Sequence, residues 1–192
     1  LFLSLPYAVR EGDLKEFREP FENLCEEGLS GFLVRNLESY AFLKEAGLAR
    51  KVVLDYSIYT FNRECQNFWE KEGILRDTVP YELTEKEITM RNHQNSELLV
   101  YGYQPMMVSA QCIQKNLDGC RKNKALLQLK DRMGKIFPVK CICDSCYNVI
   151  YNSVPLSLVG EVSQILSLSL AGVRLSFTIE NGKETEAILN TY

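Results

Sequence analysis

The chain of 192 residues has a single histidine, His93, and lacks the short motifs of the common hydrolases. Neither H-E-x-x-H nor G-x-S-x-G occurs, and there is no glycine-rich phosphate-binding motif. His93 lies in the polar stretch Arg91–Ser96, which favours a solvated loop over a general base. A base would also need a nucleophile and an orienting carboxylate, and residue spacing reveals neither.

The chain also lacks a long apolar run and an excess of positive charge. No run reaches the roughly 20 residues that a membrane span needs, so we expect no membrane partner. The formal net charge is −3, which gives no basic signature for nucleic acid over the chain as a whole. A local basic patch can exist on an acidic chain, so an RNA substrate remains open, but the sequence itself does not predict such a patch.

An initiator methionine is missing, and Leu1–Leu5 is too short and not basic enough for a signal peptide. We interpret the chain as a fragment, whose expected partner is the N-terminal part of the same polypeptide. Seven cysteines are an odd number, which is unusual for a secreted disulfide framework. The expected location is therefore the reducing cytoplasm, with Cys25 and Cys65 as small buried hydrophobic residues.

Short apolar runs alternate with helical segments before the cysteine-rich region. The expected helix starts are Asn36 and Asn62 as N-caps and Thr84–Glu87 as a capping box, and Gly73 is an expected helix stop. Each strand–helix unit takes about 20 to 25 residues, which predicts βα repeats with a parallel sheet. The expected strands are 1–5, 31–35, 51–55, 74–79 and 97–101, and the first expected helix is 13–28.

The alternation of strands and helices is interrupted in the second part of the chain and then resumes. A β-hairpin is predicted from 126–130 and 135–139, with Gly134 in the left-handed position of its turn. The later expected elements are a strand at 147–151, a helix at 156–169, a strand at 172–177 and a helix from 183.

These patterns predict one α/β domain over 1–192, a partial TIM-barrel-like (β/α) fold with a cysteine-bearing β-hairpin insertion. Barrel-like βα units at 1–111 and 154–192 would flank the insertion at 112–153. A doubly wound sheet is the alternative that the pattern leaves open.

Three carboxylates near the carboxyl ends of expected strands are candidate catalytic residues, because that end of a barrel holds the active site. Asp55 directly follows the apolar run Val52–Leu54, and Glu82 and Glu180 follow later strands. Each residue taken singly is more simply a cap or a solvated side chain. Taken together they would form a polar mouth.

Five of the seven cysteines fall in one short stretch: Cys112, Cys120, Cys141, Cys143 and Cys146. Such density indicates a 4Fe–4S cluster or a structural zinc site, and scattered free thiols are the third possibility. The uneven spacing weakens the zinc interpretation. Cys141 is the expected spare, because Cys143 and Cys146 have chelating C-x-x-C spacing and Cys141 would point to the other face of its strand.

A set of segments, in this order along the chain, resembles the collagenase-like peptidases, the family of unknown catalytic type numbered U32. The resemblance runs from about Gly31 to Phe177 and implies a TIM-barrel-like domain without its amino-terminal strands. The segments are Gly31–Leu37, Leu54–Ser57 with Phe61–Asn62, Tyr81–Thr84, Tyr101–Met107, Asp131–Gly134 with Phe137–Pro138, and Cys146–Ser153.

The resemblance implies two different kinds of activity. Some members of the family are named peptidases or collagenases. Others resemble iron–sulfur proteins that hydroxylate RNA bases or a ubiquinone precursor without oxygen, with prephenate implicated as hydroxyl donor for RNA. In that reading Cys112, Cys120, Cys143 and Cys146 are the cluster ligands. The chain departs from the common pattern at Tyr103–Gln104, where an arginine is usual, and at Pro80, where a serine is frequent.

Two hypotheses follow for the function. The first is a 4Fe–4S-dependent enzyme for oxygen-independent hydroxylation of RNA or of a small aromatic precursor. The second is a peptidase or peptide-binding domain whose cysteines hold structural zinc or no metal.

Overall fold

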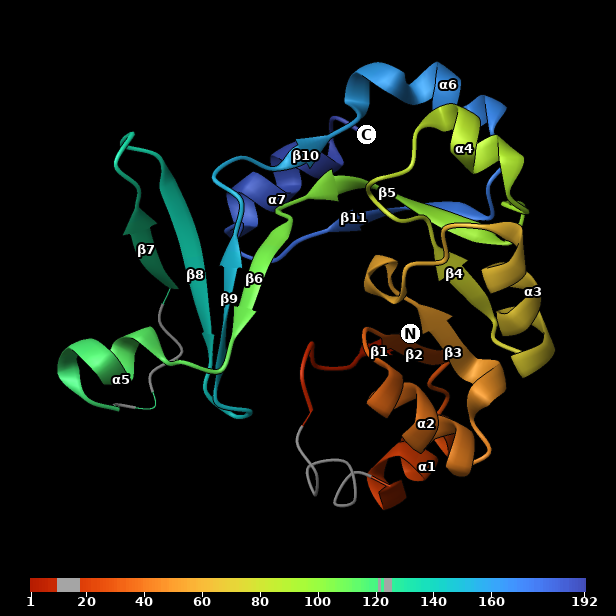
Figure 1. The fold of residues 1–192 in the computed structure, drawn as a ribbon, viewed down its shortest axis with the longest axis horizontal. Helices are drawn as coiled ribbons and strands as arrows, with labels where there is room; N and C mark the ends of the chain where they lie inside the picture. Colours follow the sequence, from red (N-terminus) through yellow and green to blue (C-terminus); the bar gives the residue numbers. More distant parts are fainter. Residues whose placement is uncertain (10–17, 121, 123–125) are drawn as a thin grey trace. The chain divides into compact units, whose positions relative to one another are not determined.

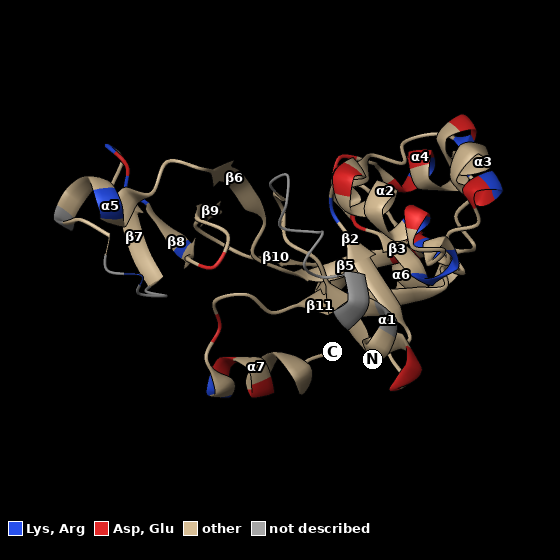
Figure 2. Ribbon diagram, turned by 90° about the horizontal axis from the view of Figure 1, so that it is seen from below, with Lys and Arg blue, Asp and Glu red and all other residues tan. Residues whose placement is uncertain are grey.

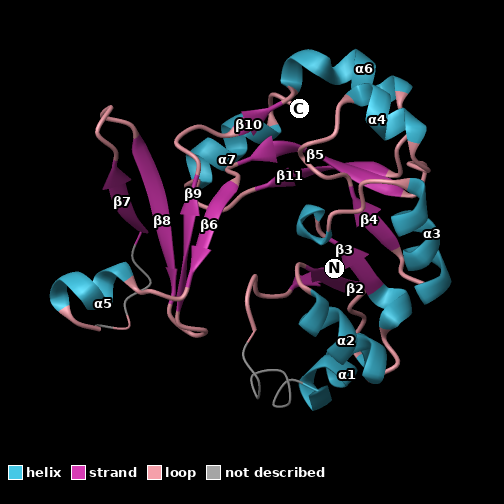
Figure 3. Ribbon diagram, in the orientation of Figure 1, coloured by secondary structure: helices cyan, strands magenta, loops and turns pink. Residues whose placement is uncertain are grey.

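The computed structural model describes residues 1–9, 18–120, 122 and 126–192. They divide into two compact units, the first comprising Leu1–Leu99 and Ser163–Val173, the second Val100–Val162 and Arg174–Tyr192. Both units mix helices and strands (Figure 1, Figure 3). The predicted insertion, 112–153, lies within the second unit. Over the described residues, no helix combines the length and apolar character needed to cross a membrane.

Parallel strands in chain order form the sheet of the first unit. They are β1 (Phe2–Ser4), β2 (Gly31–Val34), β3 (Val52–Leu54), β4 (Arg76–Thr78) and the start of β5 (Ser96–Gly102). The connecting helices are α1 (Arg18–Glu26), α2 (Leu37–Glu45), α3 (Arg63–Glu72) and α4 (Glu85–Met90). A doubly wound sheet reverses its strand order at one point, and β1–β5 do not. This mixed α/β fold, with its curled sheet, is compatible with a partial barrel.

The helix boundaries of the first unit follow from the predicted caps. The side chains of Asn36 and Asn62 each accept a hydrogen bond from the backbone N–H three residues later, and so begin α2 and α3. Thr84 and Glu87 form the capping box of α4. Gly73, with φ of 77°, ends α3 in the left-handed conformation. These cap predictions are confirmed.

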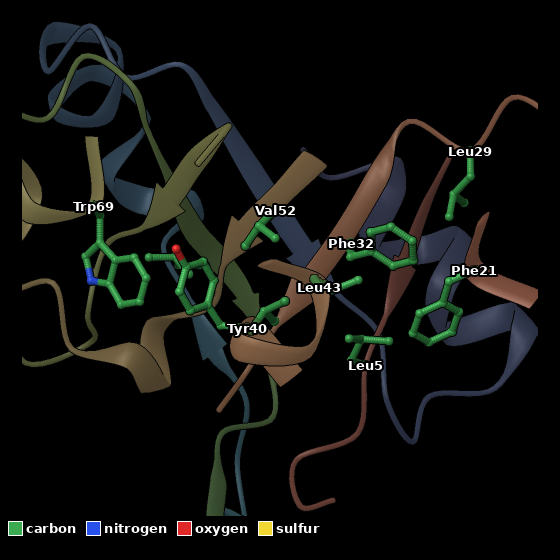
Figure 4. Packing of buried hydrophobic residues seen from close by; sticks show 10 residues of the cluster. Leu5, Phe21, Leu29, Phe32, Tyr40, Leu43, Val52 and Trp69 are labelled. Atoms are coloured by element: carbon green, nitrogen blue, oxygen red, sulfur yellow. The ribbon is translucent and has the colours of Figure 1, made fainter. Parts of the chain in front are cut away.

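Apolar residues of the central strands, of the helices that cover them and of the adjoining loops make the core of the first unit (Figure 4). All three residues of β3, Val52–Leu54, are buried, as expected for a parallel strand that is covered on both faces. Phe32 of β2 is fully buried and its ring lies 5.1 Å from that of Phe21. Tyr40 and Trp69 pack edge to face with centroids 4.7 Å apart.

The second unit contains a four-stranded antiparallel sheet in the order β6-β9-β8-β7. Its strands are β6 (Pro105–Ser109), β7 (Leu126–Lys130), β8 (Ile136–Ile142) and β9 (Tyr147–Tyr151), and α5 (Ile113–Asp118) follows β6. The hairpin of β7 and β8 turns at Gly134, which has φ of 84°. Asp131 stabilises this turn by accepting the backbone N–H groups of Met133 and Lys135, both at 2.8 Å.

Several predicted boundaries differ from the structure. The single helix predicted at 156–169 was wrong: β10 (Leu156–Ser157) pairs antiparallel with β5, and α6 is confined to Val162–Ser167. Sheet pairing with a distant strand therefore overrides local helix propensity there. Of the helix expected at 13–28, residues 13–17 lie outside the described ranges and α1 covers Arg18–Glu26. The last strand and helix are β11 (Gly172–Ser176) and α7 (Gly182–Leu189).

A buried polar network fastens β4, β5 and the loop before α3. The Arg91 guanidinium donates to the Asp77 carboxylate at 2.7 Å and to the Ser96 hydroxyl oxygen at 2.6 Å. The Ser96 hydroxyl donates to the other Asp77 oxygen at 2.5 Å, and Thr60 bonds to both Asp77 and Arg91. All four residues are at most 6% exposed, so the ion pair is shielded from water.

Arg91→Ala should destabilise the protein by about 3 to 5 kcal/mol, because it leaves the Asp77 carboxylate buried without its counter-ion. Urea unfolding followed by circular dichroism measures the loss. Lys44→Ala is the matched control, since Lys44 pairs with Glu72 where solvent screens the charges, and its effect should be much smaller. Equal losses for the two variants would contradict a structural role for the buried network.

Candidate functional site

The turn between β8 and β9 contains two of the cysteines predicted as metal ligands. The last pair of this hairpin joins Ile142 to Tyr147, so residues 143–146 form the turn. Cys143 is half-buried and Cys146 is exposed. Cys146 has φ of 56°, a left-handed conformation that lets the chain enter β9.

The other two predicted ligands lie at the two ends of α5. Cys112 is the N-cap of this helix, and its Sγ accepts the backbone N–H of Lys115 at 3.5 Å. Cys120 is exposed and follows Gly119, which has φ of 79°. The helix therefore separates Cys112 from Cys120, and a glycine-based bend precedes the second thiol.

Asn148 connects the helix segment to the cysteine turn. It lies in β9 two residues after Cys146 and pairs with Ser109 at the end of β6. Its side-chain Nδ2 donates to the carbonyl oxygen of Gln111 at 2.9 Å, and the residue is fully buried. The backbone directly before Cys112 is thus fixed to the strand that leaves the turn.

The thiols of this region influence one another electrostatically. Burial raises the pKa of the Cys143 thiol, and nearby ionisable groups raise it further: Cys112, Cys120, Asp144 and Cys146. Cys141 is only 3% exposed, and burial, Cys112 and Cys143 raise the pKa of its thiol. Because such effects act over short distances, all five thiols belong to one neighbourhood.

In this structure the thiols of this neighbourhood are not arranged as the ligands of a metal ion. Within the described ranges, no three or more His, Cys, Asp or Glu side chains are positioned to hold a metal ion. The four predicted ligands therefore share a region, joined through Asn148, without ligand geometry. Cys141 shares it too, and its burial in β8 distinguishes it from the exposed Cys120 and Cys146.

Asp55 lies directly after β3 and is almost completely buried, at 2% exposed. Its Oδ2 accepts the Arg35 Nε–H at 2.8 Å, and its Oδ1 accepts the Tyr56 N–H at 3.0 Å. Arg35 also donates to the Leu5 carbonyl oxygen and lies 4.2 Å from the centre of the Tyr7 ring. Asp55 is therefore the counter-ion of a half-buried guanidinium.

Tyrosines surround this ion pair at the carboxyl ends of β1, β3 and β4. Burial, followed by the neighbouring Tyr7 and Asp55, raises the pKa of Tyr56 well above its ordinary value. The rings of Tyr56 and Tyr81 are 4.3 Å apart. The sequence pointed to Asp55 at a strand end, and it included Tyr81 only in the segment Tyr81–Thr84 that resembles the family. It missed Tyr7, whose only available signal was its position just after an expected strand.

The other two candidate carboxylates have different settings. Glu82 follows Tyr81 in an exposed turn of the first unit. Glu180 belongs to the second unit, where its Oε2 accepts the backbone N–H groups of Thr178 at 2.6 Å and Ile179 at 2.9 Å. Burial first, and the nearby Glu180 carboxylate second, raise the pKa of Tyr101.

The first unit is an α/β domain whose parallel strands follow one another in chain order. Its candidate site, a buried ion pair with tyrosines around it, lies at the carboxyl ends of these strands. Comparison with family models extends this assignment. The model described as peptidase family U32 matches residues 1–125, which is more than half of the chain. The chain therefore belongs to peptidase family U32. The search of curated proteins and the search of solved structures found no match.

The matched region includes some of the candidate residues and ends before others. Asp55, Glu82, Cys112 and Cys120 lie inside 1–125. The cysteine turn and Glu180 lie beyond it. The pairing of β6 with β9 and the hydrogen bond from Asn148 to Gln111 connect the cysteines of the matched region with those of the turn.

Tyrosine ionisation should make the protein less stable in alkali. Tyr56 and Tyr40 have raised pKa values in the folded protein, mainly because they are buried. Their contribution to stability is complete below the ordinary tyrosine pKa of about 10 and is lost as the pH rises above it, because the unfolded chain then releases protons that the folded chain retains.

Urea unfolding at pH values of about 8 and 11 tests this expectation. Tyr56→Phe should weaken the alkaline loss, whereas Tyr59→Phe, at a side chain 52% exposed, should leave it nearly unchanged. An identical pH dependence for Tyr56→Phe and the wild type would contradict the assignment to Tyr56.

Proposed function

We propose that Cys112, Cys120, Cys143 and Cys146 hold a 4Fe–4S cluster, and that this domain of the U32 family serves oxygen-independent hydroxylation of RNA or of a small aromatic precursor. The observation that carries the proposal is the hydrogen bond from Asn148 to Gln111. It fixes the segment of Cys112 beside the strand that leaves the turn of Cys143 and Cys146. Residues distant in sequence thereby belong to one cysteine-rich region.

The donor set fits an iron–sulfur cluster chemically. Four thiolates are the usual ligands of a 4Fe–4S cluster, and soft sulfur donors favour it over hard cations. Cys120 and Cys146 are exposed, so an incoming cluster can reach them. Binding requires thiolates, so the raised pKa of Cys143 means that ligation would release a proton from this residue. When bound, the group would supply one-electron chemistry.

The three candidate carboxylates are the other protein groups of the proposal, and their roles differ. Asp55 holds the Arg35 guanidinium in place, so we assign it a positioning role at the mouth of a TIM-barrel-like domain. Glu82 is exposed and is suited to exchanging a proton with a substrate or with water. Glu180 is oriented by two backbone N–H groups, and its charge helps to keep the nearby Tyr101 hydroxyl protonated.

A peptidase or peptide-binding domain with structural zinc or no metal is the second candidate, and the family description favours it. His93 is the relevant residue, since a hydrolytic base is most often a histidine. Its Nδ1 lies 3.1 Å from the Arg91 carbonyl oxygen. The surface hollow of about 410 Å³ around it is lined by cationic, amide, hydroxyl and thioether side chains: Arg63, Asn67, Thr89, Met90, Arg91, Asn92 and Gln94. The described lining of this hollow includes no carboxylate that could orient the imidazole of His93.

Anaerobically purified protein should contain about four iron atoms and about four sulfides per chain. Cys146→Ser should abolish most of both, because it removes a ligand from the turn. Cys65→Ser, in α3 of the first unit, is the control and should retain the wild-type content. Iron and sulfide assays with metal analysis provide the measurement. One zinc per chain without sulfide would favour the second candidate and exclude the cluster.

Asn148→Ala should lower the affinity for the cluster about 10- to 100-fold, as expected when a residue that orients metal ligands is lost. The substitution removes the side-chain bond that holds the backbone of Gln111, directly before Cys112, to β9, and leaves the pairing of β6 with β9 in place. Asn116→Ala, at an exposed amide in α5, is the matched control. Iron occupancy after reconstitution at limiting iron reports the difference, and circular dichroism checks the fold. Full occupancy in folded Asn148→Ala protein would show that this bond does not organise the ligands.

A further inference from the structure

The charge of the chain is strongly segregated. Residues from Pro105 to Tyr151 contain eight of the 22 Lys and Arg residues and three of the 25 Asp and Glu residues. This segment therefore has a formal charge of +5, while the remainder of the chain has −8. The overall charge of −3 conceals a basic segment, which is why whole-chain composition gave no sign of it.

The positive side chains of this segment are exposed. Six described cations are on its surface: Lys115, Lys122, Lys130, Arg132, Lys135 and Lys140. Asp131 is occupied within the hairpin turn, where it accepts two backbone N–H groups. Figure 2 shows lysine and arginine on α5 and β8, and acidic residues on the helices of the first unit.

The hairpin of β7 and β8 displays three of these cations around its turn. Lys130 ends β7 opposite Ile136, and Arg132 and Lys135 occupy the turn itself. At the other end of the hairpin, Lys140 lies opposite Leu126 on the same face as Lys130. Leu126, the partner of Lys140, lies four residues before Lys130 along β7. The two lysines are therefore about 14 Å apart along the strand direction. The ammonium group of Lys140 also donates to the Thr178 carbonyl oxygen at 2.7 Å. We call Lys130, Arg132, Lys135 and Lys140 the basic hairpin surface.

We propose that the basic hairpin surface binds the phosphate backbone of single-stranded RNA. The inference rests on the proposed function and deepens it, because it selects RNA over a small aromatic precursor. The cations are distributed along a strand, a turn and a second strand, which suits a polymer with regularly spaced charges. A compact anion would instead require cations that converge on one point.

The same surface is poorly suited to a lipid membrane. Membrane-surface elements separate a continuous apolar face from a basic one. Here Leu126 and Ile136 share their face with Lys130 and Lys140. The opposite face of the hairpin is apolar, but its Val139 is buried and its Leu127 and Phe137 are partly buried, so this hairpin does not expose a continuous apolar face. The only aromatic side chain of the two strands, Phe137, is partly buried, so backbone contacts would dominate over base stacking.

Fluorescence anisotropy with a labelled, unstructured RNA oligonucleotide of mixed sequence tests the proposal across a series of salt concentrations. The triple variant Lys130→Gln, Arg132→Gln, Lys135→Gln should bind at least about tenfold more weakly than the wild type. The slope of log affinity against log salt should fall in magnitude by about 2, since each single-strand phosphate contact contributes about 0.7.

The control variant Arg50→Gln, Lys71→Gln, Lys86→Gln removes the same charge from exposed positions of the first unit and should keep wild-type affinity. Equal weakening in both variants would overturn the assignment to the hairpin. Tighter binding to polyglutamate or to phosphatidylserine vesicles than to RNA would overturn the choice of partner.

Iron and sulfide are measured on the same preparations, so the two proposals fail separately. Wild-type protein that contains the cluster but does not bind RNA overturns only the RNA inference. Protein that binds RNA through the hairpin but contains no iron overturns only the cluster. Retained iron in the triple variant shows that its binding loss does not come from misfolding.

Discussion

The buried amide of Asn148 is the interaction on which the organisation of the second unit depends. It holds the backbone before Cys112 against β9, and the antiparallel pairing of β8 with β9 places Cys143 and Cys146 in the adjoining turn. An unpaired donor in this fully buried position would be costly, and the bond to Gln111 satisfies the Nδ2 group, while the Oδ1 of Asn148 has no hydrogen-bond partner among the described residues. Two cysteine-bearing segments are thereby joined without a disulfide between them.

Buried ion pairs play the corresponding role in the first unit. Arg35 and Asp55 join the carboxyl ends of β2 and β3, while Arg91 and Asp77 join the loop before β5 to β4. Both guanidiniums have further hydrogen-bond partners, which offsets the cost of removing the charges from water. The strand ends are consequently held rigidly, which is the condition for positioning side chains on neighbouring loops.

Local sequence determined much of the fold but little of the long-range pairing. The caps at Asn36, Asn62 and Thr84 and the turn at Gly134 depend on residues a few positions away, and the sequence predicted them. The segment 156–169 was misassigned because its first residues pair with β5, more than fifty positions earlier. The sequence alone showed that five cysteines lie close together along the chain. The contact of Asn148 with the segment before Cys112 depends instead on the register of the strands. Local patterns do not specify such register.

X-ray absorption at the iron edge of anaerobically purified wild-type protein tests the central proposal most directly. It reports the ligand atoms and whether iron atoms are neighbours, independently of how much iron is bound. A first shell of sulfur alone with an iron–iron shell is expected if the four thiols share one 4Fe–4S cluster. Oxygen or nitrogen ligands around isolated iron atoms would contradict it.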